Sequence, residues 1–151
     1  MTFSKTALVI DEEAHFSEIM ATALRICGFH VTQCFDATSA WNLILSDPEQ
    51  TSRSLMFIDM ALEPGADDRL FSLSATDNYM TTGLVLANCI VRENVVDASR
   101  RSNIILYSAH QKAQFWLKVE KFCSDHKVRK WQKRPDADLE EIFELAANYV
   151  G

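Results

Sequence analysis

A continuous apolar run that ends in one carboxylate constrains this chain more than any other feature. Residues 55–58 read Leu-Met-Phe-Ile, Asp59 follows them, and Pro64 and Gly65 come shortly after. A run this short, closed by a turn dipeptide, predicts a strand that is buried on both faces inside a parallel sheet. Asp59 would then lie at the carboxyl end of the strand, where open α/β sheets bind ligands. Taken alone, Asp59 is more simply a polar stop after a core strand.

Similar apolar runs recur along the chain and are separated by segments with helical spacing. We predict strands at residues 5–10, 29–35, 54–59, 103–107 and 128–132. A strand and a helix therefore alternate five times. This alternation predicts an α/β fold with a doubly wound, five-stranded parallel sheet and helices on both of its faces.

The helices are predicted from apolar residues that recur on one face. The first carries Phe16 to Cys27 and ends before Gly28, a residue suited to the left-handed backbone of a helix end. The second is capped by Asp36 or Thr38 and bounded by Pro48, and the third covers 83–91. The fourth covers 112–125, and its inner face carries Phe115, Val119 and Phe122. The last begins at Asp136 or Asp138, and its inner face carries Leu139, Ile142, Phe143 and Ala146. Residues 63–82 are mostly polar and predict a long loop with room for one helical turn.

Composition and charge exclude several classes of protein. The 151 residues suffice for one domain with a real core, and the net charge of −6 argues against direct nucleic-acid binding. No apolar stretch approaches the roughly 20 residues needed to cross a bilayer, and no signal-peptide layout is present, so we expect a cytoplasmic protein without membrane contact. Four scattered cysteines predict buried reduced thiols rather than a zinc or dithiol site: Cys27, Cys34, Cys89 and Cys123.

Polar residues follow the predicted strands at the edge where their carboxyl ends meet. Asp11 and Glu12 follow the first strand, Asp59 ends the third, Ser108 follows the fourth and Lys133 follows the fifth. Ionised carboxylates brought this close repel one another, and a hard dication such as Mg²⁺ removes that cost. A lysine and a serine could hold phosphoryl oxygens, which makes Asp59 a candidate carboxylate nucleophile.

The sequence resembles the receiver domains of two-component response regulators over about residues 5–150. Four stretches carry the resemblance, in order and each at a strand end: Val9 to Glu13, Phe57 to Met60, Ile104 to His110, and Lys133 to Pro135. The resemblance implies a single receiver domain over residues 1–151 with a flavodoxin-like (βα)5 fold. It also implies phosphoryl transfer to Asp59 from a sensor histidine kinase or a phosphotransfer protein, in the presence of Mg²⁺.

The same resemblance implies residue roles. Glu12 and Asp59 would bind the metal directly, together with the backbone carbonyl of Ala61, and Asp11 would act through water. Ser108 and Lys133 would contact the phosphoryl group. A shift of Ser108 would signal to the surface around the fourth predicted helix and the fifth strand, where a downstream protein or a second copy of the chain could dock.

The sequence departs from the family pattern in two places. Pro64 lies one position further from Asp59 than is usual, and residues 63–82 resemble an insertion beside the pocket, either gating kinase access or forming a partner surface. Arg134 separates Lys133 from the following proline. The spacing from Trp131 therefore leaves open whether Lys133 or Arg134 fills the lysine position.

Two other functions stay open at this point. A degenerate receiver would keep the fold and bind partners without phosphorylation, which the insertion and the displaced proline favour. A Mg²⁺-dependent phosphohydrolase usually needs a second carboxylate two residues beyond its nucleophile, where this chain has Ala61. We therefore expect at most self-phosphorylation from a phosphodonor and autodephosphorylation. Trp116 and Trp131 form either an exposed partner patch or part of the core, and core is slightly preferred.

Overall fold

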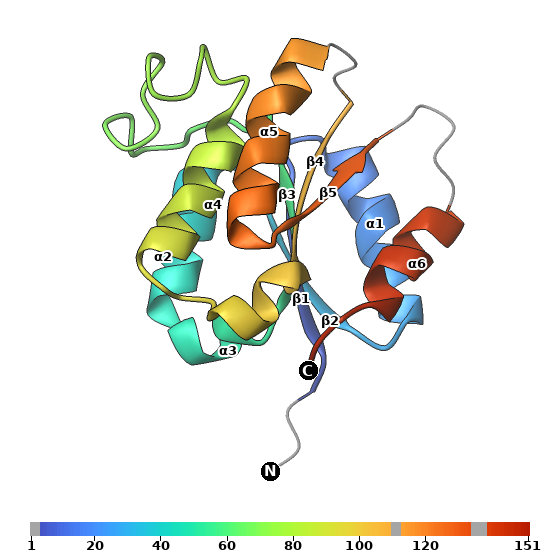
Figure 1. The fold of residues 1–151 in the computed structure, drawn as a ribbon. Coiled ribbons are helices and arrows are strands. Elements are labelled where there is room, and N and C mark those ends of the chain that lie inside the picture. The colour runs from blue at the N-terminus through green and yellow to red at the C-terminus, as the bar shows by residue number, and fades with distance from the viewer. Residues whose placement is uncertain (1–3, 110–112, 134–138) are drawn as a thin grey trace.

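Five parallel strands lie between two layers of helices in the computed structural model, which describes residues 4–109, 113–133 and 139–151 (Figure 1). The strand order is β2-β1-β3-β4-β5, and every neighbouring pair is parallel. The strands are β1 (Thr6–Ile10), β2 (His30–Cys34), β3 (Leu55–Asp59), β4 (Ile104–Ser108) and β5 (Arg129–Gln132). The predicted doubly wound, five-stranded parallel sheet is confirmed.

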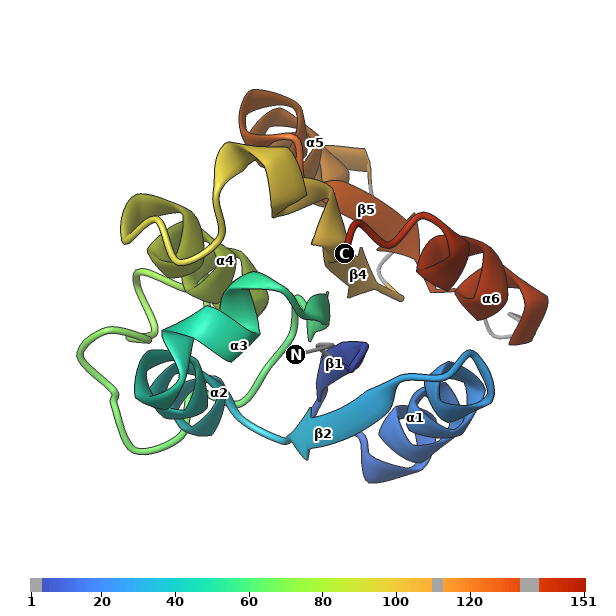
Figure 2. The same ribbon diagram turned by 90° about the horizontal axis from the view of Figure 1, so that it is seen from below.

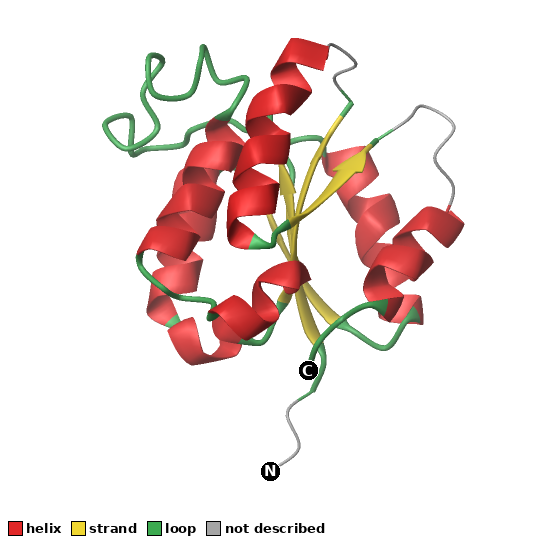
Figure 3. Cartoon of the chain, in the orientation of Figure 1, coloured by secondary structure: helices red, strands yellow, loops and turns green. Residues whose placement is uncertain are grey.

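The helices divide between the two faces of the sheet, as the turned view makes plain (Figure 2). One face is covered by α1 (Ala14–Ile26) and α6 (Leu139–Ala147). The other is covered by α2 (Ala37–Ser46), α3 (Pro48–Ser52), α4 (Thr82–Arg92) and α5 (Ala113–His126), with a short 3-10 helix, η1 (Ala98–Asn103), before β4 (Figure 3). Over the described ranges, no helix combines the length and apolar character that crossing a bilayer requires.

The ends of the first helices follow from local sequence. Gly28 has φ +90° beyond the end of α1, and the N–H of Phe29 donates to the carbonyl of Leu24, as in a Schellman motif. Asp36, rather than Thr38, caps α2, because its side chain accepts a hydrogen bond from the N–H of Ser39 at 2.7 Å. Pro48 opens the unpredicted helix α3, which Asp47 caps.

Strand alternation produces two apolar cores. Ala7 and Val9 of β1 face α1 and α6, whereas Leu8 and Ile10 face the opposite helix layer. The expected inner face of the last helix was wrong at one residue, since Leu139 is 39% exposed; its position in the first turn leaves it at the margin of the core. The tryptophans in question, Trp116 and Trp131, are partly buried against these cores, which supports the core interpretation.

The predictions for the inner face of α5 and for the cysteines can also be compared with the structure. Val119 is fully buried in α5, and Phe115 and Phe122 pack partly buried beside it. All four cysteines are free thiols; Cys27 is partly exposed and the other three are buried. The N-cap of α6, predicted at Asp136 or Asp138, lies outside the described residues, as do Arg134 and His110.

The segment between β3 and α4, residues 60–81, contains turns and bends but no helix or strand. Its first half is tied to the start of α2, where the N–H of Ala37 donates to the carbonyl of Glu63 and the N–H of Thr38 donates to that of Pro64. The ring of Phe71 has no exposed surface and anchors the segment in the core. The long loop predicted from the sequence is therefore held at several points.

Candidate functional site

The carboxyl edge of the sheet, at the top of Figure 1, holds a pocket of about 240 Å³. Eight residues line it: Glu12, Glu13, Asp59, Ala61, Met80, Ser108, Ala109 and Lys133. Five of the residues predicted to form a site are among them. Each follows or ends a strand of the parallel sheet, so the topology alone accounts for their meeting.

Asp11, the remaining predicted site residue, lies fully buried under this pocket. Its Oδ1 accepts a hydrogen bond from the N–H of Glu13 at 2.8 Å, and its Oδ2 accepts one from the hydroxyl of Tyr107 at 2.7 Å. Lys133 Nζ lies 3.9 Å from the same Oδ2. Sequence reasoning treated Tyr107 only as a strand residue. The available signal was that a buried tyrosine hydroxyl usually needs a polar partner.

The environment of Asp59 disfavours the ionised form of its carboxyl group. Burial, followed by the neighbouring charge of Asp11, raises the pKa of Asp59 from 3.8 to about 8; the charge of Lys133 and a hydrogen bond with the backbone of Ala61 act in the opposite direction. At neutral pH and without a cation, this site therefore favours a protonated Asp59. A cation beside the carboxyl would favour its ionised form instead.

Glu12 has a neighbour that the sequence did not predict. Burial raises the pKa of Glu12 first, and the charge of Glu63 raises it further. Glu63 belongs to the long loop, and Met80 near the other end of that loop lines the pocket. The loop thus supplies part of the rim of the pocket, including a carboxylate close to Glu12.

Lys133 approaches the pocket from the end of β5. Its N–H donates to the carbonyl of Ser108 at 2.9 Å, which fixes the two predicted phosphoryl-contacting residues side by side. Its Nζ lies 3.2 Å from Glu13 Oε2 and 3.5 Å from the centroid of the Phe16 ring. Because Arg134 is outside the described residues, the alternative that Arg134 fills the lysine position stays a prediction.

The donors present fit a hard dication of the Mg²⁺ type. No group of three His, Cys, Asp or Glu side chains capable of holding a metal occurs in the described part of the chain. The set expected here is smaller: two carboxylates, Glu12 and Asp59, with the carbonyl oxygen of Ala61, and these three residues line one pocket. Mg²⁺ commonly takes one or two carboxylates and fills its other positions with water and phosphoryl oxygens. Burial, followed by neighbouring acids, raises the pKa values of Glu12 and Asp59, and a dication would favour the ionised form of both carboxyls.

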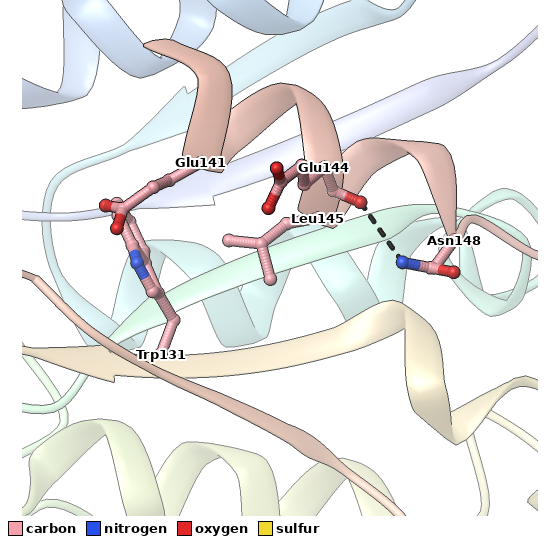
Figure 4. A pocket seen from close by; sticks show the side chains of 5 residues that line it. All are labelled: Trp131, Glu141, Glu144, Leu145 and Asn148. Atoms are coloured by element: carbon pink, nitrogen blue, oxygen red, sulfur yellow. Dashed lines mark hydrogen bonds between the residues drawn. The ribbon is translucent and has the colours of Figure 1, made fainter. Parts of the chain in front are cut away.

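A second pocket, of about 260 Å³, lies between β5 and α6 (Figure 4). Trp131 and Glu141 lie together at one end of the view, and at the other end Asn148 Nδ2 donates to the carbonyl of Glu144 at 3.1 Å. None of the predicted site residues lines it. The chemistry expected from the sequence therefore belongs to the carboxyl edge of the sheet.

Comparison with solved structures shows that the fold is that of response-regulator receiver domains. The receiver domain of NtrX from Brucella abortus has a TM-score of 0.65 and 18% identity, covering 95% of this chain and 96% of that one. The receiver domain of Francisella response regulator 1452 has a TM-score of 0.62 and 19% identity, covering 96% of each chain.

A third similar structure was solved in a modified state. It is a response regulator from Burkholderia pseudomallei with a phosphorylated aspartic acid, a calcium ion and citrate, with a TM-score of 0.62, 18% identity, and coverage of 93% of this chain and 65% of that one. No family model and no curated protein matches the sequence. At these identities the similarity shows the fold.

Proposed function

We propose that this chain is a phosphorylation-dependent signalling receiver that accepts a phosphoryl group on Asp59 with the help of Mg²⁺. The observation that carries the proposal is the meeting of Glu12, Asp59, Ser108 and Lys133 in one pocket of a receiver fold. The similar response regulator with a phosphorylated aspartic acid and a calcium ion adds support. The donor would be a sensor histidine kinase or a phosphotransfer protein.

Each side chain has a role that its chemistry allows. The dication, when bound, neutralises charge on the phosphoryl oxygens. Glu12, Asp59 and the carbonyl of Ala61 would hold it, and buried Asp11 would act through water. A carboxylate oxygen of Asp59 forms the bond to phosphorus while the bond from phosphorus to the donor nitrogen breaks.

The pocket also offers groups for the charge that develops during transfer. The hydroxyl of Ser108 donates to a phosphoryl oxygen, and the ammonium of Lys133 stabilises the negative charge. Ser108 ends β4 beside the end of β5, so its displacement would reach the surface formed by α5 and β5. We assign the contact with a downstream protein to that surface, and we place the protein in the cytoplasm.

The long loop contributes to the same proposal. Its hydrogen bonds to Ala37 and Thr38 and the buried ring of Phe71 favour a fixed partner surface over a mobile gate. Met80 is 38% exposed at the rim of the pocket, where a phosphodonor would approach. A variant that lacks only the exposed residues 73–75 keeps Phe71 and Met80 in place. It should keep its rate of phosphorylation by a small phosphodonor, whereas gating predicts a faster rate.

A small phosphodonor tests the function directly. Incubation with acetyl phosphate and Mg²⁺ should give one phosphoryl adduct by intact-protein mass spectrometry, and EDTA should prevent it. The adduct should vanish in Asp59→Asn and persist in the matched control Asp97→Asn, whose aspartate caps η1 ahead of β4. A wild-type chain without an adduct would defeat the proposal and favour a phosphorylation-independent interaction module. An adduct that survives Asp59→Asn would overturn the assignment of Asp59 as the acceptor.

A further inference from the structure

The hydroxyl of Tyr107 is a fully buried polar group that reaches across the sheet. Tyr107 lies in β4 in register with Asp59 of β3, and it has no exposed surface. Its hydroxyl donates to Asp11 Oδ2 at 2.7 Å, beyond the end of β1. Since β3 lies between β1 and β4, this hydrogen bond passes beneath the end of the strand that carries Asp59.

Aromatic neighbours fix the position of that hydroxyl. The Tyr107 ring centroid lies 5.8 Å from that of Trp131, 6.0 Å from that of Phe16 and 6.4 Å from that of Phe57. Tilted and edge-on contacts at these distances are favourable for aromatic pairs. The ring therefore has little freedom to turn, and its hydroxyl is held against Asp11.

A second donor, Lys133, lies near Asp11 Oδ2, the oxygen that Tyr107 contacts. Lys133 Nζ is 3.9 Å from Asp11 Oδ2, which is too far for a hydrogen bond, and it lies closer to Glu13 Oε2, at 3.2 Å. The other oxygen of Asp11 accepts a hydrogen bond from the N–H of Glu13, and the carboxyl of Asp59 is a further hydrogen-bond partner of Asp11. The tyrosine hydroxyl thus takes one acceptor position of Oδ2, while the Lys133 ammonium stays beyond hydrogen-bond distance of the same oxygen.

We propose that Tyr107 is a positioning residue: its hydroxyl keeps Lys133 from closing onto Asp11 and so preserves the acidic pocket for a divalent cation. The role of the divalent cation in this inference rests on the proposed function. The competition between the Tyr107 hydroxyl and the Lys133 ammonium rests on geometry alone. Without the hydroxyl, the ammonium moves toward Asp11 Oδ2 and forms a tighter ion pair there. That internal cation then opposes the binding of an external one.

A double-mutant cycle in EDTA tests the competition without any metal. Tyr107→Phe keeps the ring, and Lys133→Met keeps the length of the side chain without its charge. Tyr107→Phe should lower Tm more in the Lys133→Met background than in the wild-type background, because only the wild type has an ammonium that can satisfy the abandoned oxygen. Additive shifts in Tm would overturn the proposed competition.

Magnesium titration tests the consequence for the pocket. The rise of Tm with Mg²⁺ concentration gives Kd, and Tyr107→Phe should weaken binding by about tenfold, as for other residues that orient metal-site carboxylates. In the Lys133→Met background the same substitution should change Kd by less than about twofold. Tyr149→Phe is the matched control, because it removes a hydroxyl that donates to the carbonyl of Arg53 at 2.7 Å, away from this pocket.

The outcomes separate the inference from the function that it deepens. A wild-type chain that binds Mg²⁺ while Tyr107→Phe binds it equally well would refute the role of Tyr107 and leave the receiver proposal intact. A wild-type chain with no response to Mg²⁺ would count against the receiver proposal, and the cycle in EDTA would still decide the competition between Tyr107 and Lys133.

Discussion

The amino ends and the carboxyl ends of β1 and β3 carry polar groups of different kinds. At the amino edge of the sheet, Thr6 Oγ1 lies 2.8 Å from Ser54 Oγ and accepts a hydrogen bond from Gln50 Nε2 at 2.7 Å. These groups are neutral and satisfy one another. At the carboxyl edge of the same two strands, Asp11 and Asp59 bring two acids together, and burial, followed by the charge of Asp11, raises the pKa of Asp59 to about 8.

The difference separates a structural cluster from a candidate site. Hydroxyls and amides that hydrogen-bond to one another stabilise a fold and leave no polar group unsatisfied. Burial, followed by the charge of Asp11, raises the pKa of Asp59, and a cation beside the carboxyl would offset that cost. A buried acid with a raised pKa at the carboxyl ends of β1 and β3, opposite neutral hydrogen-bonded groups at their amino ends, favours a functional role for the carboxyl ends.

The largest contrast between the edges should be in the dependence of stability on pH. Because the pKa of Asp59 is raised in the folded protein, its contribution to stability is fully present below 3.8 and is lost as pH rises through about 8. In EDTA, the free energy of unfolding should fall by up to about 1.4 kcal/mol per pH unit across that window.

Urea denaturation at a series of pH values measures this slope. Asp59→Asn should flatten it and should be more stable than the wild type at pH values near and above 8. Asp47→Asn changes an acid that caps α3 beside the amino edge and should leave the slope in place. A wild-type stability that rises between pH 5 and 8 would contradict the contrast.

The next effect concerns how closely the backbone packs behind Asp59. A Cβ on Gly83 would lie 2.1 Å from the carbonyl oxygen of Asp59 and 2.9 Å from Cα of Met60, so Gly83→Ala must displace either α4 or the end of β3. We expect a loss of about 3 kcal/mol or more in the free energy of unfolding, together with slower phosphorylation.

Gly28→Ala is the matched control at the amino edge. Gly28 has φ +90°, and an added Cβ would meet nothing within 4 Å. It should lose only about 1 kcal/mol, from backbone strain, and keep the phosphorylation rate. Equal rates in the two glycine variants would show that the backbone behind Asp59 is not tightly constrained.

A smaller effect should come from the cation. Mg²⁺ at about 100 times its Kd should add about 2.7 kcal/mol to the free energy of unfolding at neutral pH. Glu12→Gln should reduce this gain, because it removes a carboxylate that lines the pocket, whereas Asp47→Asn should not. Thermal unfolding with and without Mg²⁺ measures both. An unchanged gain in Glu12→Gln would remove Glu12 from the ligand set.

The sequence predicted both the parallel sheet and the convergence of polar residues at its carboxyl edge, and it did so for the same reason. Continuous apolar runs such as residues 55–58 identify buried parallel strands, and a parallel sheet brings all its carboxyl ends to one edge. The convergence of Asp59, Ser108 and Lys133 was therefore predictable, while their roles in phosphoryl transfer stay predictions.

The contacts that the sequence did not predict depend on distances between side chains. The bond from Tyr107 to Asp11 crosses an intervening strand, and the approach of Glu63 to Glu12 depends on how a loop folds back. Helix α3 was missed because its residues, Pro-Glu-Gln-Thr-Ser, contain no apolar periodicity and depend on the cap and on packing. Periodicity reports which face is buried but does not report which polar groups meet.

The smallest effect should come from the neutral cluster at the amino edge, and it completes the contrast. Ser54→Ala removes the hydroxyl that contacts Thr6 and donates to the carbonyl of Gln50 at 2.9 Å. One buried neutral hydrogen bond contributes about 1 kcal/mol, so the free energy of unfolding should fall by about that amount. The slope with pH and the gain from Mg²⁺ should both equal those of the wild type in matched urea titrations. If either one shifted with Ser54→Ala, the two edges would be coupled through β3, and the carboxyl edge could no longer be treated as an independent functional unit.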